Sequence, residues 1–409
     1  MSLSMLATIA LLAAPAPAAP AATEVLQQID QIVSKRFYSA DQLTRVGWPS
    51  LVEKARAKLA QPRAEQDAIF EELIAGLKTS HTEYLSRARP EYWDIASIFE
   101  SFLKNARRRC APGEFPPVPV RRDSIGVLWK RLEGRWFVGG VLDGGPGSKA
   151  GLHLGDEIVE AEGKAFSPVP SLEGRAGKRV RLTVRRTRNA PAREIAVTPV
   201  RVSPQSEFRD AIGASARIIP TAGGRIGYVR IWSWAGGEMQ SALREAINEL
   251  NRKKITAFIL DERDGWGGAS PYYLDIFDDR PPILFSQSRS GESVLIDSQV
   301  RVPGVLLING GSRSGKEIVA YGAKKHHLAT LIGTNTAAAV LAGSPYCLKN
   351  GALLYVAVEA VTVDGEVLEG RGVAPDVVVP FDMRYADGRD PQLEKAIEVL
   401  SAQEPGALP

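Results

Sequence analysis

The sequence predicts an α/β protein in which a mixed sheet covered by helices follows a mostly-β unit and a helical N-terminal segment. Three observations lead to this fold class. Apolar residues recur with a helical period in the first hundred residues, and short strands with a period of two follow between residues 124 and 202. From Gly224 onward, strands alternate with helices, which is typical of a sheet with helices packed on its faces.

Apolar stripes predict that the N-terminal segment, residues 24–110, is mainly helical. The first stripe consists of residues on one helical face: Val25, Ile29, Ile32 and Val33. The second stripe consists of Ile69, Leu73 and Leu77. A Pro-rich stretch, residues 111–120, breaks this pattern and is interpreted as a linker.

Composition excludes several classes of protein. The chain has 409 residues, 44% of them hydrophobic and 24% charged, which is ordinary for a soluble globular protein. The net charge of +4 is small, and the Arg/Lys clusters lack the interleaved aromatic residues of a nucleic-acid surface. We therefore expect no nucleic-acid partner.

Residues 1–22 have the pattern of a signal peptide. A short apolar core, residues 6–14, is followed by an Ala/Pro stretch with A-x-A sites. The positive n-region is absent, because no Lys or Arg occurs before Lys35. The alternative is an Ala/Pro tail without this role; we favour export to the periplasm or the extracellular space.

The two cysteines, Cys110 and Cys347, could pair in an exported protein, but their separation in space cannot be derived from the sequence. The chain has no Cys-x-x-Cys motif and only four histidines. We therefore expect no structural metal and no organic cofactor.

The period-two region contains a specific motif. Residues 144–166 read GGPGSKAGLHLGDEIVEAEGKAF, and this run resembles PDZ domains, which we assign to residues 120–203. In that family a loop before the second strand receives a peptide's C-terminal carboxylate on successive N–H groups. The resemblance therefore implies carboxylate binding at Ile125, Gly126 and Val127.

Strands and helices alternate in the following part of the chain, residues 204–385. The predicted strands contain IGYVRIW, ITAFILDE, VPGVLLIN and LATLIG, and helices are predicted at residues 237–253 and 316–325. The last segment, residues 386–409, holds a capped amphipathic helix at residues 390–400 and a tail.

One loop in this region is similar to a phosphate-binding loop. Residues 310–316 fit G-x-x-x-x-G-K, but Glu317 stands where a Ser or Thr would hold Mg²⁺. A carboxylate there would face the phosphates of a nucleotide. We therefore expect no nucleotide, and a serine in the loop becomes the candidate for chemistry.

The ordered motifs IGYVRIWSW, FILDERDGWGGAS, LLINGGSRSGKEIVAYGAKK, TLIGTNT and DGEVLEGRGVAPDVVVP cover most of the chain after the PDZ-like run. Together they resemble the C-terminal processing (tail-specific) serine peptidases and their relative, the tricorn core protease. The family's S-x-S-x-x-E-I motif implies that Ser314 is the nucleophile. Ser312 is the competing serine, for which we predict turn hydrogen bonding.

An oxyanion hole is expected beside this serine. Gly315 follows Ser314 at a helix N-terminus, where free N–H groups favour negative charge. The family's second donor comes from the turn at residues 261–268 and corresponds to Gly267. Two such N–H donors suit acyl transfer. Gly265 replaces the asparagine of the family's turn.

The base of tail-specific peptidases is absent. Their lysine lies 25 residues after the serine, and that position is Ala339 here. The tricorn-like branch uses a Ser-His pair in the helical segment and a late glutamate, which correspond to Ser80, His81 and Glu369. In this interpretation His81 takes the Ser314 proton, while Ser80 and Glu369 orient it.

The sequence therefore predicts an exported serine endopeptidase that acts on protein or peptide substrates, whose C-terminal tails the PDZ domain captures. The alternative is a catalytically inactive peptide-binding scaffold of the same fold, because Ala339 replaces the family's lysine. The sequence does not define the oligomeric state.

Overall fold

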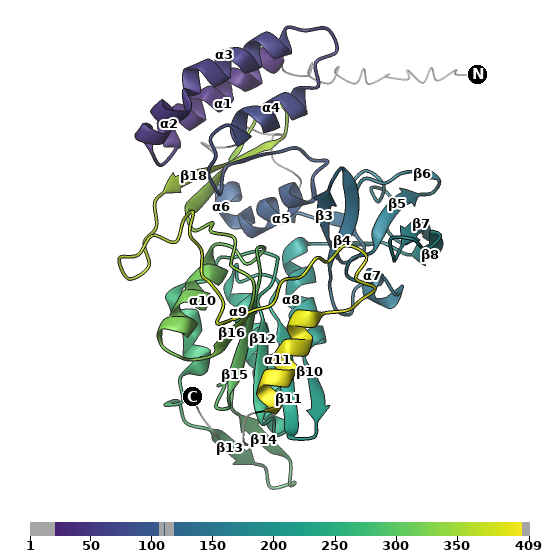
Figure 1. Ribbon diagram of the computed structural model, residues 1–409, viewed down its shortest axis with the longest axis vertical. Helices are drawn as coiled ribbons and strands as arrows, with labels where there is room; N and C mark the ends of the chain where they lie inside the picture. The colour runs from purple at the N-terminus through teal and green to yellow at the C-terminus, as the bar shows by residue number, and fades with distance from the viewer. Residues whose placement is uncertain (1–20, 106–109, 111–117, 403–409) are drawn as a thin grey trace, which may run out of the picture.

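The computed structural model describes residues 21–105, 110 and 118–402. Most of the predicted signal peptide, residues 1–22, and most of the predicted linker, residues 111–120, lie outside these residues. Figure 1 shows the N-terminal helices at one end, the β unit at one side and the larger α/β layer structure below them.

The N-terminal part is helical, and helices are present at both apolar stripes. Its helices are α1 (Ala22–Arg36), α2 (Ala40–Val46), α3 (Trp48–Leu59), α4 (Gln66–Ala75), α5 (Pro90–Ile98) and α6 (Glu100–Asn105). The chain adds one short strand, β1 (Glu83–Leu85), to a sheet with β17 (Ala342–Cys347) and β18 (Leu353–Glu359). The helices α1, α3 and α4 bury their apolar faces against this sheet. The N-terminal segment therefore packs against strands that come about 270 residues later in the chain.

The β unit, residues 122–202, consists of a six-stranded sheet and a separate two-stranded sheet, β2 with β9, and has its own apolar core. Its main strand order is β3-β4-β5-β7-β8, so β3 is an edge strand. The elements are β2 (Arg122–Ser124), β3 (Val127–Leu132), β4 (Arg135–Val141), α7 (Pro146–Lys149), β5 (Glu157–Ala161), β6 (Lys164–Ala165), β7 (Val180–Arg185), β8 (Arg193–Val197) and β9 (Val200–Val202).

The core sheet has the order β10-β11-β12-β15-β16-β19, with all neighbours parallel except β10 and β11. Its strands are β10 (Arg217–Thr221), β11 (Gly224–Arg230), β12 (Ala257–Asp261), β15 (Gly304–Ile308), β16 (Thr330–Gly333) and β19 (Val377–Val378). The helices around it are α8 (Pro204–Ser215), α9 (Gly237–Arg252), η1 (Pro271–Phe277), α10 (Gly315–Lys325) and α11 (Pro391–Ser401). The mixed sheet predicted from the alternation is thus present.

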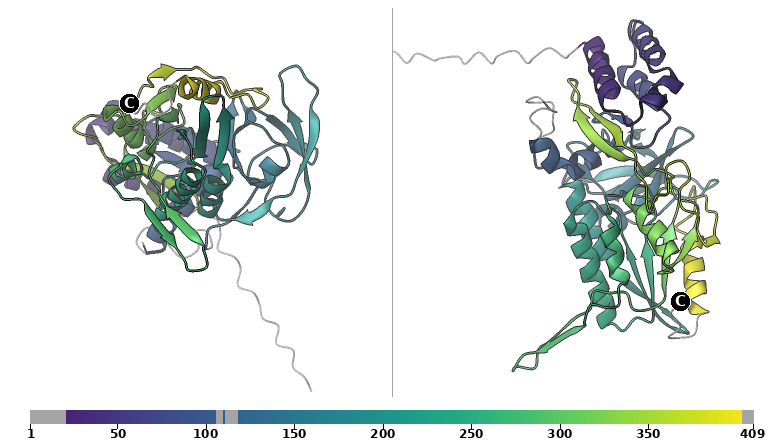
Figure 2. Two further views of the ribbon diagram at one scale, coloured as in Figure 1. Left: turned by 90° about the horizontal axis from the view of Figure 1, so that it is seen from below. Right: turned by 90° about the vertical axis from the view of Figure 1, so that its left-hand side faces the viewer.

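Helices cover both faces of the core sheet, as the right-hand view of Figure 2 shows. The helices α8, α9 and α10 share one apolar core with one face, and α11 packs on the other. A hairpin of β13 (Leu284–Gln287) and β14 (Ser293–Ile296) projects from the end far from α1 (Figures 1 and 2). No helix among the described residues is long and apolar enough to cross a membrane.

The parallel strands β11, β12, β15 and β16 all end at the same edge of the core sheet. The loops that follow their carboxyl ends therefore meet there, which is where open α/β sheets place their ligands. Ser314, Gly267 and Ala339 all lie in these loops.

Candidate active site

Ser314 lies at the turn between β15 and α10 and is half-buried. Its backbone has φ 58° and ψ −125°, a conformation that non-glycine residues rarely adopt. Such strain is typical of a turn that lifts a nucleophile above the end of a strand. The Ser314 N–H donates to the backbone carbonyl of Ala339 at 2.8 Å and to Glu317 Oε2 at 3.2 Å, which fix the turn.

Ser312 has the turn role that we predicted for it. It is fully buried, its hydroxyl donates to the carbonyl of Glu262, and it accepts from the Asn309 N–H.

Lys316, which completes the phosphate-loop motif, points into the protein. It is fully buried and its ammonium donates to the backbone carbonyls of Ile231, Glu262 and Asp264. Burial lowers the pKa of Lys316 from its ordinary value. The ammonium holds the loop after β12 and is not free to contact the phosphates of a nucleotide.

Gly267 and Gly315 lie against each other beside Ser314. A Cβ on Gly267 would come within 2.6 Å of the Gly315 nitrogen and 2.5 Å of the Ser314 Cβ, so a side chain cannot be accommodated at this position. In the described part of the chain, neither N–H donates a hydrogen bond to another group. Both donors therefore remain available for an oxyanion near the Ser314 hydroxyl.

Gly265, which replaces the asparagine of the family's turn, has φ +76°. A Cβ there would lie 2.0 Å from the Trp232 carbonyl oxygen, so this turn requires glycine.

His81 follows α4 and is almost fully buried, with 4% of its surface exposed. The Ser80 hydroxyl lies 2.9 Å from His81 Nδ1 and donates to Glu369 Oε2 at 2.9 Å. Because this hydroxyl has a single proton, which it donates to Glu369, it must accept from Nδ1–H. The imidazole is thereby held as the tautomer whose Nε2 carries a free lone pair.

Glu369 joins distant segments around this histidine. Its carboxylate also accepts from the backbone N–H groups of Ser80 and Val340, at 3.3 and 2.7 Å. Burial and, to a smaller extent, the Arg313 guanidinium lower the pKa of His81 to about 3. The ring is therefore neutral at neutral pH and able to accept a proton.

One cavity of about 180 Å³ brings the predicted residues together. Its lining includes Ser314, His81 and Gly267, and its other walls are mostly apolar. No direct hydrogen bond between the Ser314 hydroxyl and the His81 ring is formed among the described residues. Such contacts often tighten only when a substrate is bound.

The sequence did not indicate two further features of the site. Glu317 is fully buried, and its carboxylate accepts hydrogen bonds from Thr336, Ala338 and Ala339 in the loop after β16. Arg313 lines the cavity of Ser314 and a second cavity of about 320 Å³, which is also lined by Val127, Trp129 and Lys130 of the β unit. Ala339 lines this second cavity.

In the predicted carboxylate-binding loop of the β unit, one of the expected N–H donors is bonded to the protein itself. The Gly126 N–H donates to the Ser124 hydroxyl at 3.0 Å, and that hydroxyl donates to Glu207 at 2.6 Å. The side chains of Ile125 and Val127 are buried in the core of the β unit. One of the three expected N–H donors is thus already engaged.

A strained serine, a neutral histidine and a free N–H group line one cavity, and a second free N–H group lies beside them at Gly315. These are the groups that serine hydrolases use. Residues 225–379 match the model of peptidase family S41. The carboxy-terminal-processing protease of Bartonella bacilliformis is 28% identical over 268 residues, which are 60% of this chain and 58% of that protein. Tricorn protease homolog 1 of Streptomyces coelicolor is 28% identical over 275 residues, covering 63% of this chain and 26% of that protein.

Solved structures show the same fold. The photosystem II D1 C-terminal processing protease has a TM-score of 0.51 at 20% identity, covering 94% of this chain and 98% of that one. The tricorn protease has a TM-score of 0.51 at 19% identity, covering 93% of this chain and 37% of that one. The S41 match covers residues 225–379, and the curated relatives and solved structures that are similar over more of the chain are C-terminal processing and tricorn proteases. The chain spans 50% to 58% of the length of the first three curated relatives.

Proposed function

We propose that this protein is a serine endopeptidase that cleaves protein or peptide substrates through an acyl-enzyme. The observation that carries this proposal is the cavity that Ser314, His81 and Gly267 line together. The relay from Glu369 through Ser80 supplies a histidine with a free Nε2.

In the proposed reaction His81 Nε2 takes the Ser314 proton as Ser314 Oγ bonds to the scissile carbonyl carbon. The N–H groups of Gly267 and Gly315 receive the negative charge that develops on the carbonyl oxygen. His81 then returns the proton to the leaving amine, and water releases the acyl group by the same steps.

The proposal is tested by labelling the full chain with a serine-directed phosphonate and mapping the modified residue by mass spectrometry. Ser314 should be labelled, and His81→Ala should abolish labelling while the thermal unfolding midpoint shows that the protein is folded. His326→Ala, at a histidine outside the cavity, is the matched control and should be labelled at the wild-type rate. Wild-type protein that folds but is not labelled contradicts the proposal.

The second candidate is an inactive peptide-binding scaffold, favoured by Ala339 at the position of the family's lysine. The two candidates differ in the labelling experiment, because a scaffold would bind peptides without reacting. The His81 relay favours the active enzyme.

We also propose that the β unit holds the substrate. Its edge strand β3 contributes Val127, Trp129 and Lys130 to the second cavity, which shares Trp266 and Arg313 with the cavity of Ser314. A free strand edge can pair with an extended peptide. Capture of a substrate C-terminus at Ile125, Gly126 and Val127 would additionally require the Gly126 N–H to leave Ser124.

Export is a further proposal, and the disulfide between Cys110 and Cys347 favours it. Disulfides persist in oxidising compartments such as the periplasm and the extracellular space.

A further inference from the structure

The cavity that holds Ser314 has an unusual distribution of charge. Its walls include Ile95, Phe99, Leu341 and Tyr355, which make it largely apolar. Among the described residues that line it, Arg313 is the one with a permanent charge. This residue directly precedes Ser314, and both residues line the same cavity.

Arg313 is poorly satisfied by the protein itself. Its side chain is only 22% exposed, and its nearest carboxylate, Glu83, lies 3.5 Å away. Within the described part of the chain its guanidinium donates no hydrogen bond, although arginine carries five N–H donors. Glu83 also forms an ion pair with Arg89, in which Arg89 Nη2 lies 3.3 Å from Glu83 Oε2, so its negative charge is divided between two arginines.

Another arginine, Arg263, serves as a comparison because its guanidinium donates several hydrogen bonds to carboxylates. Arg263 donates to both oxygens of Asp261 and both oxygens of Asp390 at 2.6 to 2.9 Å. In contrast to Arg263, Arg313 has donors that are free to bind an anion in the cavity.

We propose that Arg313 binds a carboxylate of the substrate, next to the scissile bond, while the apolar wall of the cavity receives a neighbouring side chain. The substrate class is therefore a peptide with an apolar residue and a carboxylate within one or two residues of the cleaved bond. This inference rests on the proposed function. The carboxylate belongs either to the C-terminus of the substrate peptide or to one of its Asp or Glu side chains, since a guanidinium binds both in the same bidentate way.

The electrostatics of the site add a consequence of this binding. The positive charge of Arg313 contributes to lowering the pKa of His81. A carboxylate bound to the guanidinium would offset that charge, and His81 would become a stronger base when such a substrate is present.

Arg313 has a competing structural role. Its ion pair with Glu83 connects the nucleophile turn to β1, two residues after His81, and its guanidinium lies 5.5 Å from the Trp266 ring. A purely structural arginine would affect all substrates equally. A carboxylate-binding arginine would affect only those that carry the carboxylate.

The test measures binding, so that it does not depend on catalysis. Full-length protein with Ser314→Ala is titrated with fluorescent peptides of one apolar sequence, made with a free C-terminus, with a C-terminal amide, and as amides with an internal Asp or Asn. We expect the free acid or the Asp peptide to bind about 10- to 100-fold more tightly than its neutral counterpart, as charge-assisted hydrogen bonds allow. The peptide that shows the preference identifies the source of the carboxylate.

Adding Arg313→Met should remove this preference and leave the affinity for neutral peptides within about threefold. Glu83→Gln is the matched control: it breaks the same ion pair but leaves the guanidinium, so the preference should persist. Equal affinity for acidic and neutral peptides, no peptide binding, or a preference that survives Arg313→Met would overturn the inference. Failure of phosphonate labelling with an intact preference would instead refute only the proposed peptidase activity.

Discussion

At the scale of single residues, Glu317 connects two loops of the candidate site, a role that its position in the sequence does not suggest. Its buried carboxylate accepts from the Thr336 hydroxyl, from the N–H groups of Ala338 and Ala339, and from that of Ser314, at 2.5 to 3.2 Å. The loop after β16, which contains Ala339, is thus held to the turn at Ser314 by a carboxylate. Burial raises the pKa of Glu317, while these donors act against that shift.

We predict that Glu317→Gln lowers the free energy of unfolding by about 1–3 kcal/mol, because the amide NH₂ would face N–H donors. Chemical denaturation measures the loss, and the rate of phosphonate labelling should fall with it. Glu366→Gln alters an exposed carboxylate paired with Arg371 and should change stability by less than about 0.5 kcal/mol. Equal stability of Glu317→Gln and the wild type would contradict this role.

The second prediction at this scale concerns the pH dependence of the reaction. The active form of His81 is unprotonated, and its pKa is lowered from 6.5 to about 3. The lowered pKa moves the acid limb of the rate profile to lower pH, so labelling should persist well below pH 6. The groups that face the ring are Ser80, Arg313 and Tyr355, and burial raises the pKa of Tyr355 to about 12, so it stays neutral.

Arg313→Met should move this acid limb upward, since Arg313 contributes to the lowered pKa of His81. Labelling rates are measured between pH 3 and 8, with circular dichroism to confirm that the protein stays folded. An acid limb near the ordinary histidine value in the wild type would argue against a buried His81 as the base.

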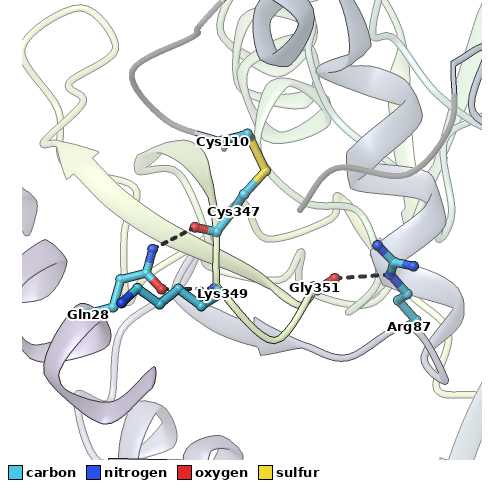
Figure 3. Close-up of a disulfide and its surroundings, with 6 residues drawn as sticks. All are labelled: Gln28, Arg87, Cys110, Cys347, Lys349 and Gly351. Atoms are coloured by element: carbon cyan, nitrogen blue, oxygen red, sulfur yellow. Dashed lines mark hydrogen bonds between the residues drawn. A yellow bond between two sulfur atoms is a disulfide. The ribbon is translucent and has the colours of Figure 1, made fainter. Parts of the chain in front are cut away.

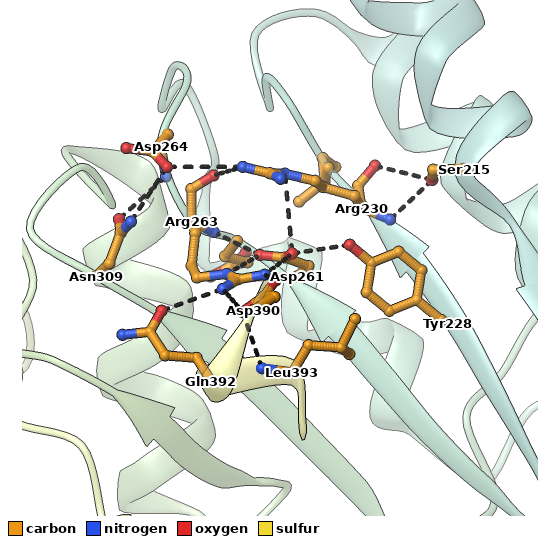
Figure 4. A network of polar contacts seen from close by, with 12 residues as sticks. Ser215, Tyr228, Arg230, Asp261, Arg263, Asp264, Asn309, Asp390, Gln392 and Leu393 are labelled. Carbon is orange, nitrogen blue, oxygen red and sulfur yellow. Dashed lines mark hydrogen bonds and ion pairs between the residues drawn. The ribbon is translucent and has the colours of Figure 1, made fainter. Parts of the chain in front are cut away.

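At the scale of elements, the C-terminal helix α11 is attached to the core through a buried ionic network (Figure 4). Arg263, in the loop after β12, bridges Asp261, the last residue of β12, and Asp390, the N-cap of α11. Tyr228 donates to Asp261 from the neighbouring strand at 2.8 Å. The same loop begins the turn that ends at Gly267, so the network also holds the start of this turn.

We predict that Arg263→Met destabilises the protein by about 3–5 kcal/mol, because it leaves two carboxylates without their partner. Hydrogen exchange in α11 should increase more than in α9. Asp390→Ser is the matched control, since serine preserves an N-cap acceptor and removes only the charge. Uniform exchange across the protein after Arg263→Met would mean that the network does not hold α11 specifically.

Elements with a local signal could be predicted from the sequence, and those made by distant pairing could not. The stripe from Val25 to Val33 predicted α1, and the capped pattern before Leu400 predicted α11, because a helix buries one face of a local repeat. The strand β1 has only three residues and gains its partner from β18, far along the chain. Nothing in its own sequence indicates that pairing.

The candidate site also contains residues that sequence motifs predicted and contacts that they did not. Ser314, His81 and Glu369 were predicted from motifs, and the structure brings them to one region, while their catalytic roles stay predictions. The weakly paired guanidinium of Arg313 and the four donors around Glu317 depend on loops from separate parts of the fold. Only three-dimensional contacts could have shown them.

At the scale of the whole molecule, a disulfide connects two segments that are far apart in the sequence. The disulfide joins Cys110, which lies between α6 and β2, to Cys347 at the end of β17 (Figure 3). Gln28 of α1 donates to the Cys347 carbonyl at 3.1 Å, so the N-terminal helices meet the same point. The strand β17 begins at Ala342, which lines the Ser314 cavity, so this connection extends to the site.

We predict that the double variant Cys110→Ala, Cys347→Ala is less stable than the wild type by about 2–5 kcal/mol, because the bond closes a loop of 237 residues and restricts the unfolded chain. Alanine is chosen since Cys347 is fully buried and a serine hydroxyl would lack a partner. Reductant should lower the thermal midpoint of the wild type toward that of the variant and leave the variant unchanged. If thiol titration shows full reduction and the wild-type midpoint does not move, the bond does not stabilise the fold.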